Sequence, residues 1–249
     1  MRLIQVSDCH LHADPAARSR TGNPYRQWCR VLDEVARYQP DMLLVTGDIS
    51  QDDSQASYVL AERELARLEC PWYWLPGNHD VPALMQQFQA PTTRVDLGSV
   101  DMLLLNTQVI GEAHGKLGPE RLAALDAELS RSQRAPLLAM HHPPLAVGSA
   151  WIDALGLVDA AEFWQVLAAH EPVEAIFCGH VHQAFDTRQA LPRGEVPVHA
   201  CPSTSDQFLP GSRAFAVDSE ALPGFRIIDL PPSADNGAVS TRVVRVPLP

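Results

Sequence analysis

Five short apolar runs in this chain end in aspartate, asparagine or histidine, and this pattern limits the possible folds more than any other feature of the sequence. In chain order the polar ends read D-x-H, G-D, G-N-H-D, H-H-P-P and G-H-x-H. Each run has the length of a buried strand. Turn formation alone explains one such stretch, because Pro, Gly, Asn and Asp are common turn residues. Polar ends on five strands instead predict a shared site.

Strands and helices alternate in the first part of the chain. Apolar runs at residues 3–6, 41–46 and 71–75 predict strands, and helical spacing at residues 25–38 and 54–68 predicts the helices between them. This order is typical of a layered α/β fold, in which ligands bind beyond the carboxyl ends of the strands. We therefore expect the polar strand ends to meet at that edge.

The rest of the chain adds further strands and helices. The expected elements are a short helix at 82–88, a hairpin at 94–107, a helix at 118–130, a strand at 136–140, a loop at 148–157, a helix at 159–170 and a strand at 173–178. Alternating runs at 196–200, 225–230 and 241–246 predict a second, antiparallel sheet. No linker divides the chain, so we expect a single domain over residues 1–249.

Composition narrows the possible partners. The formal net charge is −11 and no basic cluster is present, which argues against nucleic acid as a partner. No signal peptide is visible, and no run approaches the roughly 18 apolar residues that a membrane span needs. The five cysteines contain no C-x-x-C pair. We expect a cytoplasmic protein with reduced thiols that has no membrane partner.

The residue types at the strand ends are those of a metal site. In the D-x-H motif, Asp8 and His10 are expected on one face because a strand has a period of two, and the same argument applies to His180 and His182. Imidazole and carboxylate suit Fe, Mn, Zn or Co. The two prolines that follow the histidine pair at 141–142 predict a stiff exit that fixes both imidazoles.

The ordered set of motifs resembles the calcineurin-like metallophosphoesterase family over essentially the whole chain. The resemblance implies an α/β fold, a four-layer sandwich of two mixed β-sheets flanked by helices. Further stretches at residues 47–52, 114–117, 148–157 and 202–208 are similar to the bacterial class III cyclic-nucleotide phosphodiesterases, which hydrolyse cyclic AMP. These stretches are less diagnostic than the ligand motifs.

The resemblance also implies a binuclear metal centre. Its two ions are divalent or of mixed valence, and Fe, Mn and Zn all accept such ligands. The implied ligands are Asp8, His10 and His182 for the first ion, Asn78, His141 and His180 for the second, and Asp48 for both. Two such ions can hold a bridging hydroxide that attacks phosphorus while both ions stabilise the reacting oxygens.

Three neighbouring residues are expected to act without binding metal. His79 would contact the phosphate or protonate the leaving 3′-oxygen, since an imidazole titrates near neutrality. Asp80 would orient His79 or a metal ligand. His142 would either support a ligand or contact the substrate. The remaining histidines are interpreted as surface or packing residues: His12, His114, His170 and His199.

The favoured activity is hydrolysis of 3′,5′-cyclic AMP, or of another cyclic nucleotide, to the 5′-monophosphate. A related enzyme acting on glycerophosphodiesters, phosphomonoesters or other small phosphodiesters would use the same ligands. A scaffold that has lost its metals is disfavoured because every expected ligand is present. Asp159 stands where cyclic-nucleotide members typically have asparagine, and a carboxylate beside an anion is unfavourable. Trp151 is either core packing or a lid over a planar ligand, and the oligomeric state stays open, a homodimer included.

Overall fold

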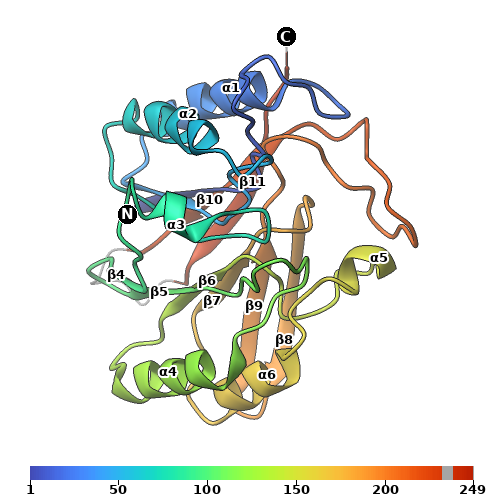
Figure 1. Cartoon of the computed structure of the whole chain (residues 1–249). Helices are drawn as coiled ribbons and strands as arrows, with labels where there is room; N and C mark the ends of the chain where they lie inside the picture. The colour runs from blue at the N-terminus through green and yellow to red at the C-terminus, as the bar shows by residue number, and fades with distance from the viewer. Residues whose placement is uncertain (232–237, 249) are drawn as a thin grey trace.

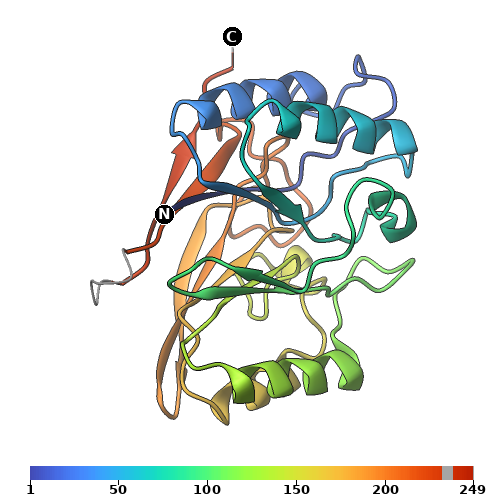
Figure 2. The same ribbon diagram turned by 90° about the vertical axis from the view of Figure 1, so that its left-hand side faces the viewer.

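Two β-sheets pack face to face, and helices cover the outer face of each (Figures 1 and 2). The computed structural model describes residues 1–231 and 238–248. Two helices lie on one side of the sheets and two on the other, so the layers follow the order helix, sheet, sheet, helix. This arrangement confirms the α/β sandwich of two mixed sheets.

The first sheet has five strands. In spatial order they are β11 (Ser240–Arg245), β10 (Gly224–Asp229), β1 (Arg2–Val6), β2 (Met42–Val45) and β3 (Trp72–Trp74). β1, β2 and β3 are parallel, whereas β10 runs antiparallel to both of its neighbours. The carboxyl ends of the three parallel strands therefore lie at one edge.

The second sheet has six strands. In spatial order they are β4 (Arg94–Asp96), β5 (Asp101–Leu105), β6 (Leu137–Met140), β7 (Ala175–Cys178), β9 (Gly194–Ala200) and β8 (Phe185–Leu191). The four inner strands are parallel, and β4 and β8 pair antiparallel at the two edges.

Four longer helices form the outer layers. They are α1 (Pro24–Ala36) and α2 (Gln55–Ala66) on the first sheet, and α4 (Gly118–Arg131) and α6 (Ala160–Ala168) on the second. α3 (Pro82–Met85) and α5 (Ala150–Asp153) are single turns within connections. The expected loop at 148–157 thus contains a helical turn.

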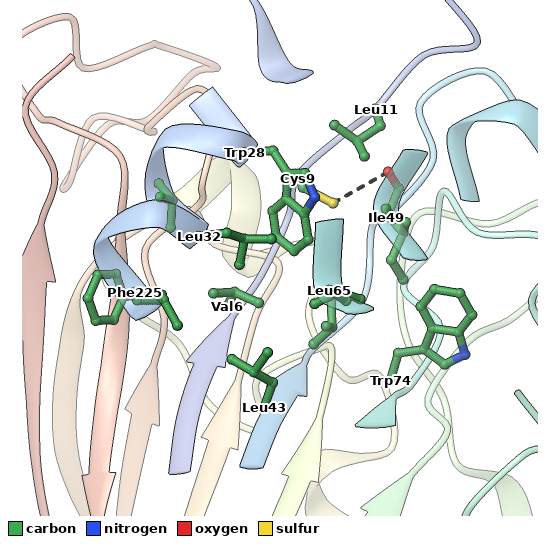
Figure 3. Close-up of a cluster of buried hydrophobic side chains, with 14 of the residues drawn as sticks. Val6, Cys9, Leu11, Trp28, Leu32, Leu43, Ile49, Leu65, Trp74 and Phe225 are labelled. Atoms are coloured by element: carbon green, nitrogen blue, oxygen red, sulfur yellow. Dashed lines mark hydrogen bonds between the residues drawn. The ribbon is translucent and has the colours of Figure 1, made fainter. Parts of the chain in front are cut away.

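Apolar side chains fill the space between the layers. Figure 3 shows Trp28 and Leu32 of α1 and Leu65 of α2 beside the strand residues Leu43 and Phe225, all of them buried. A second cluster lies between the two sheets, and a third joins the second sheet to α4 and α6. Each large side chain buried in this way contributes about 1.5–3 kcal/mol.

The C-terminal strands correct one prediction. The runs at 196–200, 225–230 and 241–246 do not form a separate antiparallel sheet, because β9 joins the second sheet beside β7 while β10 and β11 extend the first sheet beside β1. β10 and β11 are antiparallel, as expected, but their buried face packs with β1. No helix within the described residues has both the length and the apolar character needed to cross a bilayer.

Candidate metal centre

The segments that follow β1, β2 and β3 meet those that follow β6 and β7 at one edge of the two sheets. The backbone N–H of Asp8 donates to the carbonyl of Gly47 at 3.0 Å, which joins the first two segments. The N–H of His180, after β7, donates to the Asp8 carboxylate at 3.1 Å. Polar residues far apart in sequence are therefore brought into contact at this edge.

The first group of candidate ligands consists of Asp8, His10, Asp48 and His182. One ligand atom from each lies within 4.8 Å of the others. Nε2 of His10 is 3.1 Å from Nε2 of His182, which is itself 3.4 Å from a carboxylate oxygen of Asp8. The four side chains that the sequence predicts around the first ion thus converge on one point.

The second group is built around the amide oxygen of Asn78. This oxygen lies 3.2 Å from Nε2 of His141 and 3.1 Å from Nδ1 of His180. Asp48 connects the two groups, because Oδ1 is 3.5 Å from Nε2 of His141 while Oδ2 is 3.6 Å from Nε2 of His10. One carboxylate therefore faces both candidate metal positions.

Three of the four imidazoles are oriented in the same way. Each places Nδ1 against an oxygen acceptor, so that Nδ1 carries the proton and the lone pair of Nε2 points into the site. The pairs are His10 with Oε1 of Gln51 at 2.8 Å, His141 with the carbonyl of Thr46 at 2.7 Å, and His182 with the carbonyl of Asp206 at 2.7 Å.

The backbone at the site corrects the argument from strand periodicity. β1 ends at Val6 and β7 ends at Cys178, so the D-x-H and H-x-H motifs lie beyond the strands. Five candidate ligands have positive φ values between 47° and 70°, namely Asp8, His10, Asp48, His180 and His182. Such a backbone is costly for residues other than glycine and is concentrated at functional sites. The side chains converge because of these turns.

The donor set fits transition metal ions. Nε2 of His10 and Nε2 of His182 lie 3.1 Å apart, and Nδ1 of each ring donates its proton to an oxygen outside the group. The lone pairs of the two Nε2 atoms therefore face each other, an arrangement that a shared cation would stabilise. Burial lowers the pKa of His10 to about 4, which keeps it neutral, as a metal ligand must be. Burial alone would lower the pKa of His141, but the adjacent Asp48 raises it to about 9. A bound cation would neutralise the Asp48 carboxylate in place of the protonated His141, and His141 would then lose its extra proton.

His79 lies beside the two groups but belongs to neither. Its backbone N–H donates to Oδ1 of Asp48 at 2.9 Å, and its ring meets the His10 ring edge to face with centroids 5.0 Å apart. The side chain is exposed and lines a cavity of about 520 Å³ that also contains His10, Asp48 and Asn78. A group bound at the candidate ligands would therefore be within reach of His79.

Asp80 holds the backbone rather than the His79 side chain. Its buried carboxylate accepts hydrogen bonds from the N–H groups of Gly77, Ile49 and Ser50 at 2.9–3.1 Å and from the hydroxyl of Tyr58 at 3.0 Å. The segments after β2 and β3 are tied together in this way. Asp80 thus acts on the loops that carry Asp48 and Asn78, and of the two expected roles this favours support of the metal ligands over orientation of His79.

His142 is completely buried and is not part of the cavity lining. Its Nδ1 lies 2.8 Å from the hydroxyl of Thr107, and its ring packs against His180 with centroids 4.6 Å apart. One ring nitrogen of His142 lies within 4.8 Å of ring nitrogens of His141 and His180, so this position favours a role beside the ligands, by support or by coordination, over contact with substrate. Nε2 of His142 and Nε2 of His180 are both buried without a hydrogen-bond partner among the described residues.

Asp159 does not face the site, contrary to expectation. Its carboxylate accepts the backbone N–H groups of Leu117 and Gly118 at the start of α4, at 2.7–3.1 Å. The residue is buried and does not line the cavity. The predicted conflict between Asp159 and an anionic substrate therefore does not arise.

Several supporting residues were not predicted. Gln51 and Asp206 fall within stretches that carry the family resemblance, yet the sequence gives them no role until the imidazoles that they hold are placed. Thr46 acts through its backbone carbonyl, and no sequence pattern signals such a contact. Thr107 is separated by 35 residues from His142, so only the fold brings the two together.

Comparison with known proteins agrees with this geometry. Residues 1–184 match the calcineurin-like phosphoesterase family. The chain belongs to this family of metal-dependent phosphoesterases, which confirms the resemblance seen in the sequence.

Individual relatives make the comparison more specific. The 3′,5′-cyclic adenosine monophosphate phosphodiesterase CpdA of Vibrio vulnificus is 39% identical over 99% of this chain and 90% of its own length. The protein of the same name from Pseudomonas aeruginosa is 36% identical over 98% of this chain and 89% of its own length. Among solved structures, a dimetal phosphatase from Danio rerio has a TM-score of 0.67 at 14% identity and covers 91% of this chain and 94% of that protein. That last likeness concerns the fold alone.

Proposed function

We propose that this chain is a binuclear metallophosphodiesterase that hydrolyses 3′,5′-cyclic AMP to 5′-AMP. The observation that carries the proposal is the position of Asp48, whose two oxygens lie 3.5 and 3.6 Å from histidines of two separate ligand groups. The substrate is taken from the relatives, whose names specify a cyclic AMP phosphodiesterase.

The proposed ligands divide between two ions. Asp8, His10 and His182 would hold the first, Asn78, His141 and His180 the second, and Asp48 both. When bound, Fe, Mn or Zn ions polarise the phosphoryl oxygens and lower the pKa of water. The neutral amide of Asn78 keeps the negative charge of the ligand set low, which favours an anionic substrate.

His79 is the proposed proton donor. Opening of the cyclic diester forms a bond between phosphorus and a water oxygen and breaks the bond between phosphorus and the 3′-oxygen. The leaving 3′-oxygen needs a proton, and the exposed imidazole of His79 lines the same cavity as Asp48. The hydrogen bond from the backbone N–H of His79 to Asp48 fixes the backbone from which this imidazole extends.

A substrate panel tests the proposal. The protein is freed of metal, reloaded with Mn²⁺, Fe²⁺ or Zn²⁺, and assayed with cyclic AMP, glycerophosphocholine and p-nitrophenyl phosphate. We expect metal-dependent release of 5′-AMP at the highest kcat/KM of the three. Faster cleavage of glycerophosphocholine or of the monoester would overturn the assignment to cyclic AMP and keep the metal centre.

Other features of the working protein are also proposals. We infer that the chain acts as one domain. We also infer that it is cytoplasmic, since its five cysteines are free and three of them are buried. The negative net charge of the whole chain supports a small-molecule substrate rather than nucleic acid.

A further inference from the structure

One side of the cavity is an aromatic wall made of Trp151, Phe208 and Phe215. The three rings meet edge to face, with centroids 5.0 Å apart for Trp151 and Phe208, 5.1 Å for Trp151 and Phe215, and 5.5 Å for the two phenylalanines. Trp151 comes from α5, and both phenylalanines come from the long connection between β9 and β10. All three line the cavity that contains His10, Asp48 and His79.

The aromatic wall is continuous with the candidate metal centre. The Phe208 ring stacks on the imidazole of His182 with a centroid distance of 3.9 Å and an angle of 4° between the planes. A phosphate held at the ligand groups would therefore place the rest of its molecule next to these rings. The wall lies where the nucleoside part of a bound nucleotide can extend.

Core packing does not account for the whole wall. Trp151 and Phe208 pack against a small apolar cluster, but Phe215 is 46% exposed, and this exposure lies in a concave site. Aromatic faces left open in a cavity are suited to cover a planar apolar group by stacking. The sequence alone left open whether Trp151 is core or lid, and its contacts with Phe208 and Phe215 place it in this wall.

Two arginines extend the wall. The guanidinium of Arg20 lies 4.6 Å from the centroid of the Phe215 ring, and Arg18 lines the same cavity. Neither arginine forms an ion pair with a carboxylate in residues 1–231 and 238–248. The Asp206 carboxylate holds the loop that carries them, because it accepts the backbone N–H of Arg20 at 3.1 Å and the hydroxyl of Ser19 at 2.7 Å.

Few side chains beside the wall are free to identify the edge of a base. The Ser19 hydroxyl donates to Asp206, and the Ser205 hydroxyl donates to the carbonyl of Asp8 at 3.0 Å. Two further polar side chains of the lining have partners outside the wall, because Gln51 Oε1 lies 2.8 Å from Nδ1 of His10 and His12 lies 3.9 Å from the Asp52 carboxylate. The guanidinium groups of Arg18 and Arg20 can donate to N7, an acceptor that adenine and guanine share. Stacking on Phe or Trp is likewise available to every base.

We propose that the aromatic wall with Arg20 is a purine subsite that holds the base of a nucleoside phosphate by stacking and accepts adenine and guanine alike. The position of the phosphate rests on the proposed function, whereas the claim about the base rests on the wall. The wall would therefore select nucleotides over phosphodiesters without a ring, and it would discriminate weakly between the two purines.

Calorimetric binding of AMP, GMP and ribose 5-phosphate to the Mn²⁺-loaded protein tests the proposal without turnover. We expect AMP and GMP to bind with dissociation constants within about tenfold of each other, and ribose 5-phosphate to bind about 5- to 150-fold more weakly, as expected for one stacked base. Phe215→Leu and Trp151→Leu keep apolar volume and remove the ring. Each should weaken AMP and GMP binding and leave ribose 5-phosphate binding unchanged.

Trp72→Leu is the matched control, because Trp72 is half-buried in β3 and does not line the cavity. It should leave the binding of all three ligands unchanged. The proposal is overturned if the dissociation constants of AMP and GMP differ by more than about tenfold in either direction, which would require recognition of the base edge. It is also overturned if ribose 5-phosphate binds as tightly as AMP, or if both wall variants bind AMP normally.

The calorimetry and the substrate panel together separate this proposal from the proposed function. A protein that leaves cyclic AMP intact and still ranks the three ligands as expected would refute the phosphodiesterase activity and support the purine subsite. A protein that opens cyclic AMP but binds ribose 5-phosphate as well as AMP would do the reverse.

Discussion

Nδ1 of His182 lies 2.7 Å from the backbone carbonyl oxygen of Asp206, while the carboxylate of the same Asp206 holds the loop that bears Arg20. One residue therefore contacts a candidate metal ligand through its backbone and the rim of the cavity through its side chain. The backbone contact fixes which imidazole nitrogen faces the site. The side-chain contacts determine where a cationic loop lies relative to the aromatic wall.

The two roles of Asp206 can be separated by Asp206→Asn. The substitution retains the carbonyl that meets His182, but it places an amide where the N–H of Arg20 and the groups of Thr21 now donate. We expect unchanged metal content, a higher KM for cyclic AMP, and a free energy of unfolding lower by about 1.5–3 kcal/mol, the range for hydrogen bonds to a charged group. Elemental analysis and steady-state kinetics check this, and loss of metal from the variant would contradict it.

The Asp206 carboxylate also predicts a pH dependence of stability. Burial raises its pKa, but hydrogen bonds from Thr21, Ser19 and Arg20 outweigh burial and leave the pKa below its ordinary value. Because the folded-state pKa is the lower one, the stabilisation is complete above the unfolded value of about 3.9 and is lost as the pH falls through the folded value.

Denaturant unfolding of the wild type and of Asp206→Asn, compared across pH, measures this effect. The difference in free energy of unfolding should be constant between about pH 7 and pH 5 and should shrink below about pH 4. A difference that grows with acidity would show that the sign is wrong.

The role of His79 is tested by His79→Ala. Because His79 belongs to neither ligand group, the variant should keep both ions and lose about 10²- to 10⁴-fold in kcat, as expected when a general acid is removed. His170→Ala is the matched control, since His170 pairs with Asp126 outside the site. Full activity of the His79 variant would remove this residue from the mechanism.

Gly77 is expected to tolerate no side chain. A Cβ at this position would lie 2.1 Å from Oδ1 of Asp48 and 2.7 Å from Cε1 of His141. Gly77→Ala should therefore displace both groups, lower the metal content, and destabilise the fold by about 1–3 kcal/mol, the range for overpacking.

Gly156→Ala provides the comparison for Gly77→Ala. Its added Cβ would meet backbone oxygens only at 3.4–3.5 Å, so its metal content and unfolding should be close to those of the wild type. Equal metal content in the two alanine variants would show that the close approach at Gly77 does not position Asp48.

Parts of the fold followed from the sequence for a clear physical reason. β1, β2, β6 and β7 are short, apolar and completely or almost completely buried, so their runs are visible without an alignment. β8 was not predicted, because it is an edge strand in which partly buried and exposed residues alternate through a polar stretch. The placement of β9, β10 and β11 required pairing across the chain, which local periodicity does not encode.

The site was predicted less evenly. The motifs that contain the candidate ligands could be recognised in the sequence. The structure places their side chains within contact distance, and metal binding by each residue stays a prediction. The reason given for the convergence was wrong, since left-handed backbone at Asp8 and His182 replaces strand periodicity. Phe215 was not singled out because the connection at 201–223 has no periodic pattern and its residues are brought to the cavity only by the fold.

The most direct test of the central claim is a metal titration of cyclic AMP hydrolysis. Mn²⁺ is added stepwise to metal-free protein while 5′-AMP is followed by phosphorus NMR, in the wild type, in Asp48→Ala, and in Asp53→Asn as a control at an exposed aspartate of the same loop. We expect wild-type and control activity to rise until about two ions are bound per chain, and Asp48→Ala to retain neither ion nor activity. Intact cyclic AMP at full metal occupancy, or two bound ions in Asp48→Ala, would contradict the account.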